Sequence, residues 1–306
     1  MLARAPVLRL DADLVHAHSM RLAYEYRHIP TVLDVPMIMT FHGQTPRGVG
    51  GLDRHKRNLL FEGVEVALAN TEFARRQLVS LGCPVEKTRI LPQGIRLSDY
   101  PFEPADFPAG GRVRLLSVGR LQPDKGFRYA ISAVRELVSR GYDVDYTIVG
   151  GGPEDGALRT HTAHLGLDGV VHLVGRVDDD TLGDLYRRSH VFILPSVGSG
   201  LDDHTETQGV VIQEAQASGV IVTASRVGGI PECVDEGRSA FLFEDRNPEA
   251  IADAVSAVMD HPEKWRRWQD AGRAWVEARF DVEVLGERMG RLYAQILAQR
   301  AKEAES

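Results

Sequence analysis

Two glutamates, Glu206 and Glu214, stand eight residues apart in Thr-Glu-Thr-Gln-Gly-Val-Val-Ile-Gln-Glu-Ala, and together they could do chemistry. We expect Glu206 in a loop and Glu214 inside a helix that starts near Gly209, so the free amides of the helix N-terminus lie between the two carboxylates. A diphosphate could bind the amides of Gly209, Val210 and Val211, leaving one carboxylate on either side for sugar hydroxyls. Taken alone, the spacing favours a capped surface helix with two solvated glutamates.

A second group of charged residues changes this balance. Arg120 and Lys125 lie in Val-Gly-Arg-Leu-Gln-Pro-Asp-Lys-Gly, which follows an expected strand and opens an expected helix. Ligands of open parallel sheets bind beyond the carboxyl ends of the strands, so we expect both cations to point into that crevice. There they would stabilise the negative charge that grows on a departing diphosphate. Each cation by itself is more often an ordinary surface residue.

Two further strand ends could line the same crevice. The turn Gly150-Gly151-Gly152-Pro153 lacks the spacing of a dinucleotide fingerprint, and we interpret it as a tight strand-to-helix turn that brings Gly151 near the ligand. Arg176 and Val177 follow the next strand, where a base pocket and a solvated loop are both open interpretations.

Three histidines lie at strand ends in the first hundred residues. His16 and His18 face one side of a strand, and His42 follows an apolar strand in Thr-Phe-His-Gly. A zinc site would need another ligand, and no Asp, Glu or Cys is placed to provide one. Hydrogen bonding to a polyhydroxyl acceptor is the better interpretation for His18, His42 and Gly43, whereas His16 is expected to be a satisfied structural histidine.

The elements that must position these residues alternate between short apolar runs and amphipathic stretches, as in parallel sheets covered by helices. The expected strands are 13–17, 35–41, 64–69, 89–92, 113–118, 144–149, 170–174, 191–194 and 220–224. The expected helices are 127–140, 156–165, 179–188, 210–218, 248–259 and 262–279.

Length and composition favour two globular domains. The chain has 306 residues, 43% of them hydrophobic, and a net charge of −7 that gives no general attraction to nucleic acid. Its two cysteines form no disulfide framework or zinc motif. The sequence has no secretory leader and no run of eighteen apolar residues, so we expect a cytoplasmic protein.

The expected boundary lies in the Pro- and Gly-rich segment 100–111. It separates a short first domain (1–107) from a complete doubly wound domain (112–280), and the segment 281–306 forms a last helix. The fold class is therefore α/β, with two Rossmann-like halves of which the first is incomplete.

Assembled in order, these residues resemble glycosyltransferase family 4, whose members are retaining enzymes of the GT-B fold. The resemblance covers nearly the whole chain. The matching segments are 15–18, 40–43, 70–73, 90–95, 119–120, 125–126, 150–153, 175–177, 194–196, 206–214 and 217–219.

The resemblance implies how these residues work. Arg120 and Lys125 would hold the donor diphosphate, Glu214 the ribose hydroxyls and Glu206 the transferred sugar. His42 would sit beside the sugar and the acceptor. The acceptor is expected to attack from the face of the leaving group, a donor phosphate oxygen would help to remove its proton, and no metal or other cofactor would be needed.

The resemblance also implies a nucleotide-sugar donor, a saccharide or lipid-linked acceptor, and a final helix that returns to the first domain. Two features depart from the family: Gln208 replaces a common aromatic residue, and the first strand with its Gly-rich loop has no counterpart. Two alternatives therefore stay open, a non-catalytic nucleotide-sugar-binding module and a nucleotide-sugar epimerase. The basic stretch Arg54–Arg57 beside Leu59 could touch a membrane surface, although a solvated helix face is the simpler interpretation.

Overall fold

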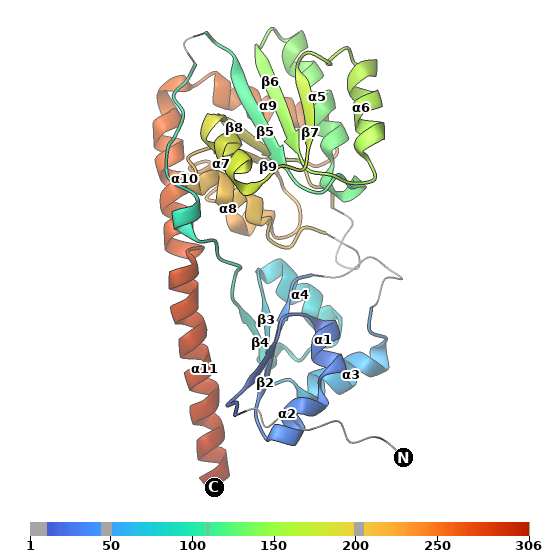
Figure 1. Cartoon of the computed structure of the whole chain (residues 1–306), viewed down its shortest axis with the longest axis vertical. Coiled ribbons are helices and arrows are strands. Elements are labelled where there is room, and N and C mark those ends of the chain that lie inside the picture. Colours follow the sequence, from blue (N-terminus) through green and yellow to red (C-terminus); the bar gives the residue numbers. More distant parts are fainter. Residues whose placement is uncertain (1–10, 44–50, 109, 199–204, 306) are drawn as a thin grey trace. The chain divides into compact units, whose positions relative to one another are not determined.

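The chain folds into two compact units, of which one comprises residues 92–286 and the other residues 1–91 together with 287–306. A computed structural model describes residues 11–43, 51–108, 110–198 and 205–305 (Figure 1). The division differs from the boundary expected near residues 107–112, because the segment from Pro92 packs with the second unit. Ile95 lies in one apolar cluster with Ala217, Cys233 and Phe280, so its burial ties this segment to the second unit.

The second unit contains a six-stranded, fully parallel sheet. Its order is β10-β9-β8-β5-β6-β7, so the chain builds outward from β5 in one direction and then restarts at β8 in the other. This is the strand order of a classical dinucleotide-binding fold, and its topological switch point lies between β5 and β8. The strands are β5 (Val113–Val118), β6 (Val144–Val149), β7 (Val171–Gly175), β8 (Val191–Leu194), β9 (Ile221–Ser225) and β10 (Ala240–Phe243).

Helices cover both faces of this sheet because successive strand side chains point to opposite sides. Leu115 packs with helices α5 and α9 on one face, whereas the next residue, Leu116, packs with α7 and α8 on the other. Figure 1 shows the two helical layers. The helices of this unit are α5 (Phe127–Ser139), α6 (Asp155–His164), α7 (Asp179–Arg188), α8 (Val210–Ala217), α9 (Pro248–Met259) and α10 (Trp265–Arg279).

The first unit contains a four-stranded parallel sheet in the order β1-β2-β3-β4. Met39 and Ala67 pack with α1, α3 and α4 on one face, while Ile38 and Leu68 face the other way. The elements are β1 (Val15–Ala17), α1 (Met20–Glu25), α2 (His28–Leu33), β2 (Met37–Phe41), α3 (Arg54–Gly63), β3 (Val66–Ala69), α4 (Glu72–Ser80) and β4 (Thr88–Ile90).

The last helix, α11 (Val282–Glu305), begins in the second unit, and its residues from Glu287 belong to the first. Tyr293 and Ile296 of this helix cover the sheet face formed by Ile38 and Leu68. Without them that face would leave apolar side chains in water.

Most expected elements are present, some with the expected bounds and others with shifted ends. Helices α1, α2 and α4 were not among the expected elements. Strand β10 was not expected, because Ala-Phe-Leu-Phe between Ser239 and Glu244 is too short to separate from a loop by its pattern. The helix expected to start at Pro262 starts at Trp265 after one 3₁₀ turn. Pro262 lacks the amide hydrogen of a helix interior but fits this first turn.

Candidate functional site

The segments that follow the carboxyl ends of the central strands pack closely against each other. At the contact points stand glycines, because a side chain would not fit there. A Cβ atom on Gly126 would lie 2.0 Å from the Pro195 carbonyl oxygen after β8, and one on Gly150 would lie 1.8 Å from the Gly119 oxygen after β5. Gly126 and Gly150 have φ angles of 67° and 139°, which favour glycine. The segments that follow β5, β6 and β8 are thereby held at the switch point of the sheet.

Lys125 and Glu206 meet at this point, from the segments after β5 and β8. The Lys125 Nζ atom donates to Glu206 Oε2 at 2.5 Å, and the two side chains are only 14% and 16% exposed. Lys125 is fixed by the 3₁₀ turn Pro123–Lys125, and the Val197 amide donates to the Asp124 carbonyl. The structure therefore brings together a cation and a carboxylate that the sequence separates by 81 residues.

Arg120 and Arg176, the other two cations of the candidate site, are exposed. Arg176 follows β7, and a Cβ atom on Gly151 would lie 3.3 Å from its Nε atom, so the guanidinium lies along the glycine turn after β6. Val177 is half-buried and packs on the cluster that contains Leu116. The ends of β5, β6 and β7 thus carry the residues expected there.

The loop before α8 is fixed by backbone contacts. Gly209 caps the helix with φ 73°, and the Glu206 carbonyl accepts the Gly229 amide at 2.9 Å. Gln208 is 1% exposed and makes a paired hydrogen bond with the Gln93 backbone, donating to its oxygen at 2.7 Å and accepting from its nitrogen at 2.8 Å. This pairing lies within the second unit and satisfies the buried side-chain amide of Gln208.

Glu214 lies on the first turns of α8, and its carboxyl group is held by two tyrosines that no sequence motif indicated. The Tyr186 hydroxyl donates to Glu214 Oε2 at 2.8 Å, and the Tyr100 side chain hydrogen-bonds the same group. Burial raises the pKa of Glu214 above its ordinary value, while the two tyrosine hydrogen bonds act in the opposite direction. Tyr186 had a weak sequence signal, as a buried position of the expected helix 179–188, whereas Tyr100 lies in the supposed linker and had none.

In the first unit, three histidines gather at the ends of β1 and β2. His16 contacts Thr40 Oγ1 through Nε2 and Tyr293 Oη through Nδ1, each at 2.7 Å, which confirms a satisfied structural histidine. The His18 ring stacks on His16 with 4.2 Å between centroids. Asn70 donates to His42 Nδ1 at 3.5 Å, and burial, followed by the charge of His18, lowers the pKa of His42. Gly43 follows with φ 103°.

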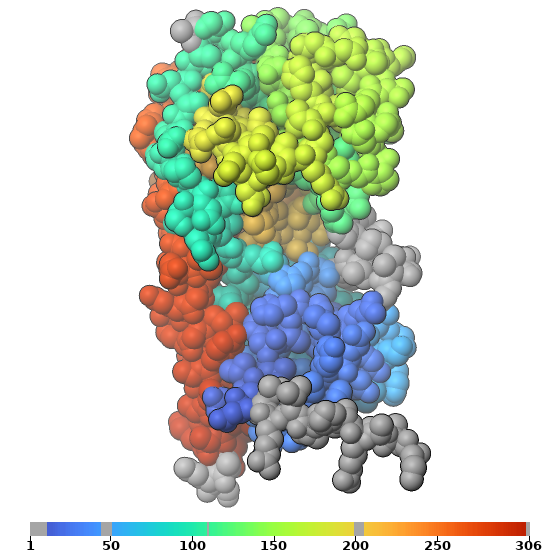
Figure 2. All heavy atoms as spheres, viewed as in Figure 1, coloured from blue at the N-terminus to red at the C-terminus, as the bar shows by residue number. Residues whose placement is uncertain are grey.

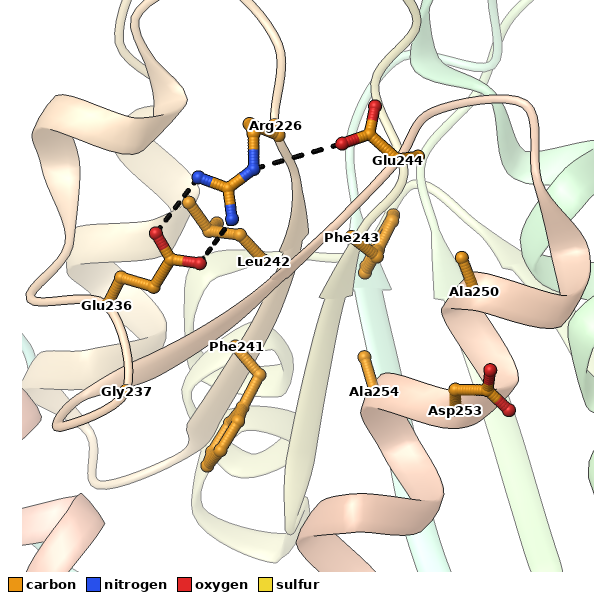
Figure 3. A pocket seen from close by; sticks show the side chains of 10 residues that line it. All are labelled: Arg226, Glu236, Gly237, Phe241, Leu242, Phe243, Glu244, Ala250, Asp253 and Ala254. Atoms are coloured by element: carbon orange, nitrogen blue, oxygen red, sulfur yellow. Dashed lines mark hydrogen bonds and ion pairs between the residues drawn. The ribbon is translucent and has the colours of Figure 1, made fainter.

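Two other charged regions form no site of this kind. The triple acid at 178–180 starts α7, as expected, because the Asp178 carboxylate accepts the Thr181 amide at 2.8 Å. A pocket of about 410 Å³ lies between β10 and α9, but its cation, Arg226, already pairs with Glu236 and Glu244 (Figure 3).

The basic stretch on α3 is partly used for structure. Arg57 donates to the carbonyl oxygens of Leu52 and Leu81, and Lys56 pairs with Asp53. Leu59 is 38% exposed, whereas the neighbouring Leu60 and Phe61 belong to the core.

Within the described ranges, no three histidine, cysteine, aspartate or glutamate side chains converge as metal ligands would. None of the helices in the described part of the chain combines the length and apolar character needed to cross a bilayer. Both cysteines are buried and unpaired.

Two solved structures share the fold of this chain over most of its length. Alr3699/HepE of Anabaena, solved in complex with UDP, aligns with a TM-score of 0.80 and 19% identity over 92% of this chain and 79% of that one. Sucrose-phosphate synthase of Thermosynechococcus elongatus aligns with a TM-score of 0.76 and 22% identity over 94% of this chain and 74% of that one. The fold is therefore GT-B.

The sequence identifies the family. Residues 102–275 match the family described as Glycosyl transferases group 1, and residues 2–99 match Glycosyltransferase Family 4. The chain belongs to the group 1 glycosyl transferases.

Curated relatives include the amylovoran biosynthesis glycosyltransferase AmsK of Erwinia amylovora, 31% identical over 81% of this chain and 60% of that protein. A D-inositol 3-phosphate glycosyltransferase of Acidothermus cellulolyticus is 31% identical over 84% of this chain and 63% of that protein. The chain thus spans less than two thirds of the length of these relatives.

Proposed function

We propose that this protein is a retaining, metal-independent glycosyltransferase that moves a sugar from a nucleotide-sugar donor to a saccharide or lipid-linked acceptor. The observation that carries the proposal is the meeting of Lys125 and Glu206 at the switch point of the six-stranded sheet, with the N-terminus of α8 directly after them. A site with a buried cation, a carboxylate and free helix amides suits a sugar diphosphate, which carries hydroxyls beside phosphate charge.

In this mechanism the donor diphosphate binds Lys125, Arg120 and the amides of Gly209–Val211. These groups stabilise the charge that develops as the bond between the anomeric carbon and the phosphate oxygen breaks. Glu206 accepts hydrogen bonds from the transferred sugar, and Glu214 from the ribose. The acceptor hydroxyl attacks from the side on which the diphosphate leaves, and its proton passes to a phosphate oxygen of the departing nucleotide. The anomeric configuration is thereby retained.

No metal is required in this scheme, because two side-chain cations and helix amides supply the positive charge that a bound ion supplies in other sugar-transfer sites. Gly151, Arg176 and Val177 are proposed to line the side of the donor site formed by β6 and β7. Independence of a metal ion can be tested by adding EDTA, which should change neither turnover nor donor affinity.

The first unit is proposed to serve the acceptor through His18, His42 and Gly43. Lowering of the His42 pKa keeps its imidazole neutral near pH 7, which suits a hydrogen-bond partner of sugar hydroxyls. His42→Ala should therefore spare donor binding and lower transfer. Exposed Leu59 beside Arg54 and His55 supports peripheral contact with a membrane that carries a lipid-linked acceptor.

The relatives support a role in polysaccharide or glycoconjugate biosynthesis, since AmsK is named as an amylovoran biosynthesis glycosyltransferase and a relative from Escherichia coli as a putative colanic acid biosynthesis glycosyltransferase. Alr3699/HepE of Anabaena was solved with UDP and with UDP-glucose, so UDP-sugars are the first donors to test.

The testing experiment incubates the purified 306-residue chain with UDP-, GDP- and ADP-sugars, with EDTA and with saccharide or polyprenyl-phosphate acceptors. We expect one donor to raise the thermal unfolding midpoint saturably and to yield a glycoside of unchanged anomeric configuration by NMR. A folded chain that responds to no donor would contradict the proposal. Binding without turnover would favour the non-catalytic module, and a changed sugar without transfer would favour the epimerase.

A further inference from the structure

Glu214 is held by two tyrosine side chains that come from different parts of the second unit. Tyr186 lies on α7 and is 1% exposed, and its hydroxyl donates to Glu214 Oε2 at 2.8 Å. Tyr100 lies in the segment between β4 and β5 and hydrogen-bonds the same carboxyl group. The two tyrosine rings meet edge to face, with their centroids 6.3 Å apart.

The backbone of Tyr100 is itself anchored to the helix that carries Glu214. Arg273 of α10 donates from one guanidinium nitrogen to the Tyr100 carbonyl at 2.8 Å and to the Ala217 carbonyl, at the end of α8, at 2.9 Å. Its side chain is 19% exposed and also pairs with Glu277. One arginine therefore fixes Tyr100 relative to α8, and Tyr100 in turn contacts the Glu214 side chain.

The Tyr186 ring is held in place by apolar neighbours. It packs in the apolar cluster of Leu116, Phe192 and Ile212, between the sheet and α8. Part of the surface of α7 is exposed in Figure 2. Asp179 and Asp180 of this helix are exposed. Because these apolar neighbours enclose the ring, the hydroxyl group is held beside Glu214 of α8.

From this arrangement we infer that Tyr186 and Tyr100 are positioning residues that hold the Glu214 carboxylate in one orientation for the two ribose hydroxyls of the donor. An ionised carboxylate offers about four acceptor positions. The tyrosines occupy two of them, and the remaining two match the two hydroxyls of a ribose diol. This inference rests on the proposed function, since it concerns how the same donor site selects its nucleotide.

The two hydrogen bonds also act on the protonation of the Glu214 carboxyl group. Burial and the nearby Asp179 raise the pKa of Glu214, and the hydrogen bonds from Tyr186 and Tyr100 lower it. Loss of both hydroxyls would leave the desolvation uncompensated, so the carboxyl group would take up a proton at a higher pH and would lose acceptor capacity.

The test compares the wild-type chain with Tyr100→Phe, Tyr186→Phe and the double variant, all as the full chain. The probes are UDP, GDP and ADP, of which the one that binds is then compared with its 2′-deoxy form by calorimetry. Tyr146→Phe is the matched control, because Tyr146 is equally buried but its hydroxyl bonds Ser117 Oγ at 2.7 Å. Thermal unfolding checks that each variant is folded.

We expect the wild type and Tyr146→Phe to prefer the ribonucleotide, and the double variant to lose about tenfold in affinity for it but much less for the deoxynucleotide. The ribonucleotide affinity of the double variant should also begin to fall at a higher pH as the solution is acidified. In a Glu214→Gln background, the tyrosine substitutions should have no further effect on the preference.

Equal losses for the two nucleotides, or an unchanged preference in the folded double variant, would overturn the inference while leaving nucleotide binding intact. If no nucleoside diphosphate binds the folded wild type, it is the proposed function that fails. If loss of the buried Tyr186 hydroxyl unfolds the chain, the single variant Tyr100→Phe still tests the inference. Tyr100 is only half-buried, so its substitution should be tolerated.

Discussion

The Nζ atom of Lys125 lies 2.5 Å from Oε2 of Glu206, and these two side chains are joined in a site that water scarcely reaches. A pair so enclosed is satisfied as long as both partners are present, and removal of one leaves a buried charge without compensation. In the proposed donor site, a diphosphate that binds Lys125 would compete with Glu206, and the Glu206 carboxylate would then accept hydrogen bonds from hydroxyl groups of the sugar. Donor binding would thereby set the orientation of Glu206.

Lys125→Ala should lower the affinity for the nucleoside diphosphate by about 10- to 100-fold, because a charge-assisted contact to phosphate is lost. Calorimetric titration measures this. Lys264→Ala is the control, since Lys264 is exposed and reaches Glu263 only at 4.0 Å. Equal affinities in both variants would remove Lys125 from the donor site.

Glu206→Gln should separate binding of the nucleotide from binding of the sugar. The neutral amide competes less for Lys125, so the nucleoside diphosphate alone should bind as tightly as in the wild type or more tightly. The intact nucleotide-sugar should lose the additional affinity that its sugar provides, and transfer should fall by about 100-fold. Parallel titrations with nucleotide and nucleotide-sugar measure the difference, and a parallel loss for both ligands would contradict the role given to Glu206.

Gly126→Ala should destabilise the second unit by about 1–3 kcal/mol and weaken donor binding, because its Cβ would lie 2.0 Å from the Pro195 carbonyl oxygen at a φ of 67°. Urea unfolding and nucleotide titration measure the two effects. Gly156→Ala, on α6 with no atom within 4 Å of the new Cβ, should instead be neutral or stabilising by up to about 1 kcal/mol. If both variants unfold alike, the close approach at Gly126 does not constrain the loop.

The sequence was sufficient for most of the second unit, because long amphipathic stretches alternate there with buried β-branched runs. Strands 113–118, 144–149 and 191–194 and helices 179–188 and 248–259 have the expected bounds. The glycines of the turns after β5 and β6 are visible in the sequence. The structure gives their reason, since a Cβ atom on Gly126 or Gly150 would collide with the backbone of a neighbouring segment. Short elements such as β10 carry too few residues for a pattern, and their identity depends on tertiary pairing with β9.

The candidate site was only partly predictable. Arg120, Lys125, Glu206 and Glu214 could be selected by charge, by order along the chain and by their place after strands. Their partners could not, because the Lys125–Glu206 pair and the Tyr186–Glu214 bond join residues 81 and 28 positions apart through the tertiary fold. Tyr100 could not be selected because the proline-rich composition around it suggested a linker. In the structure, Arg273 joins this segment to α8 by hydrogen bonds to the Tyr100 and Ala217 carbonyl oxygens.

Acidification should destabilise the fold through His190, which is 1% exposed and accepts the Arg114 amide on Nδ1 at 2.8 Å. Burial, and then the charge of Arg114, lowers the pKa of His190 from 6.5 to about 4. As the pH falls below 6.5, this histidine binds a proton in the unfolded chain, whereas in the folded chain it binds one only near pH 4. The free energy of unfolding therefore decreases as the pH falls from 6.5 to about 4.

His190→Asn, which keeps an acceptor near the Arg114 amide, should flatten the decline of the thermal unfolding midpoint between pH 6.5 and 4. His164→Asn, at an exposed position, should leave the decline unchanged. An identical pH profile for both variants would show that His190 does not contribute to it.

The most direct test of a donor site in the second unit is calorimetric titration of UDP, GDP and ADP into the full chain without divalent metal, for the wild type and Glu214→Ala. We expect saturable one-to-one binding of one nucleotide and a loss of at least tenfold in affinity in the folded variant, because the ribose hydroxyls would lose their proposed acceptor. Binding of equal strength to both proteins, or no binding of any nucleotide to a folded wild type, would contradict the proposed donor site.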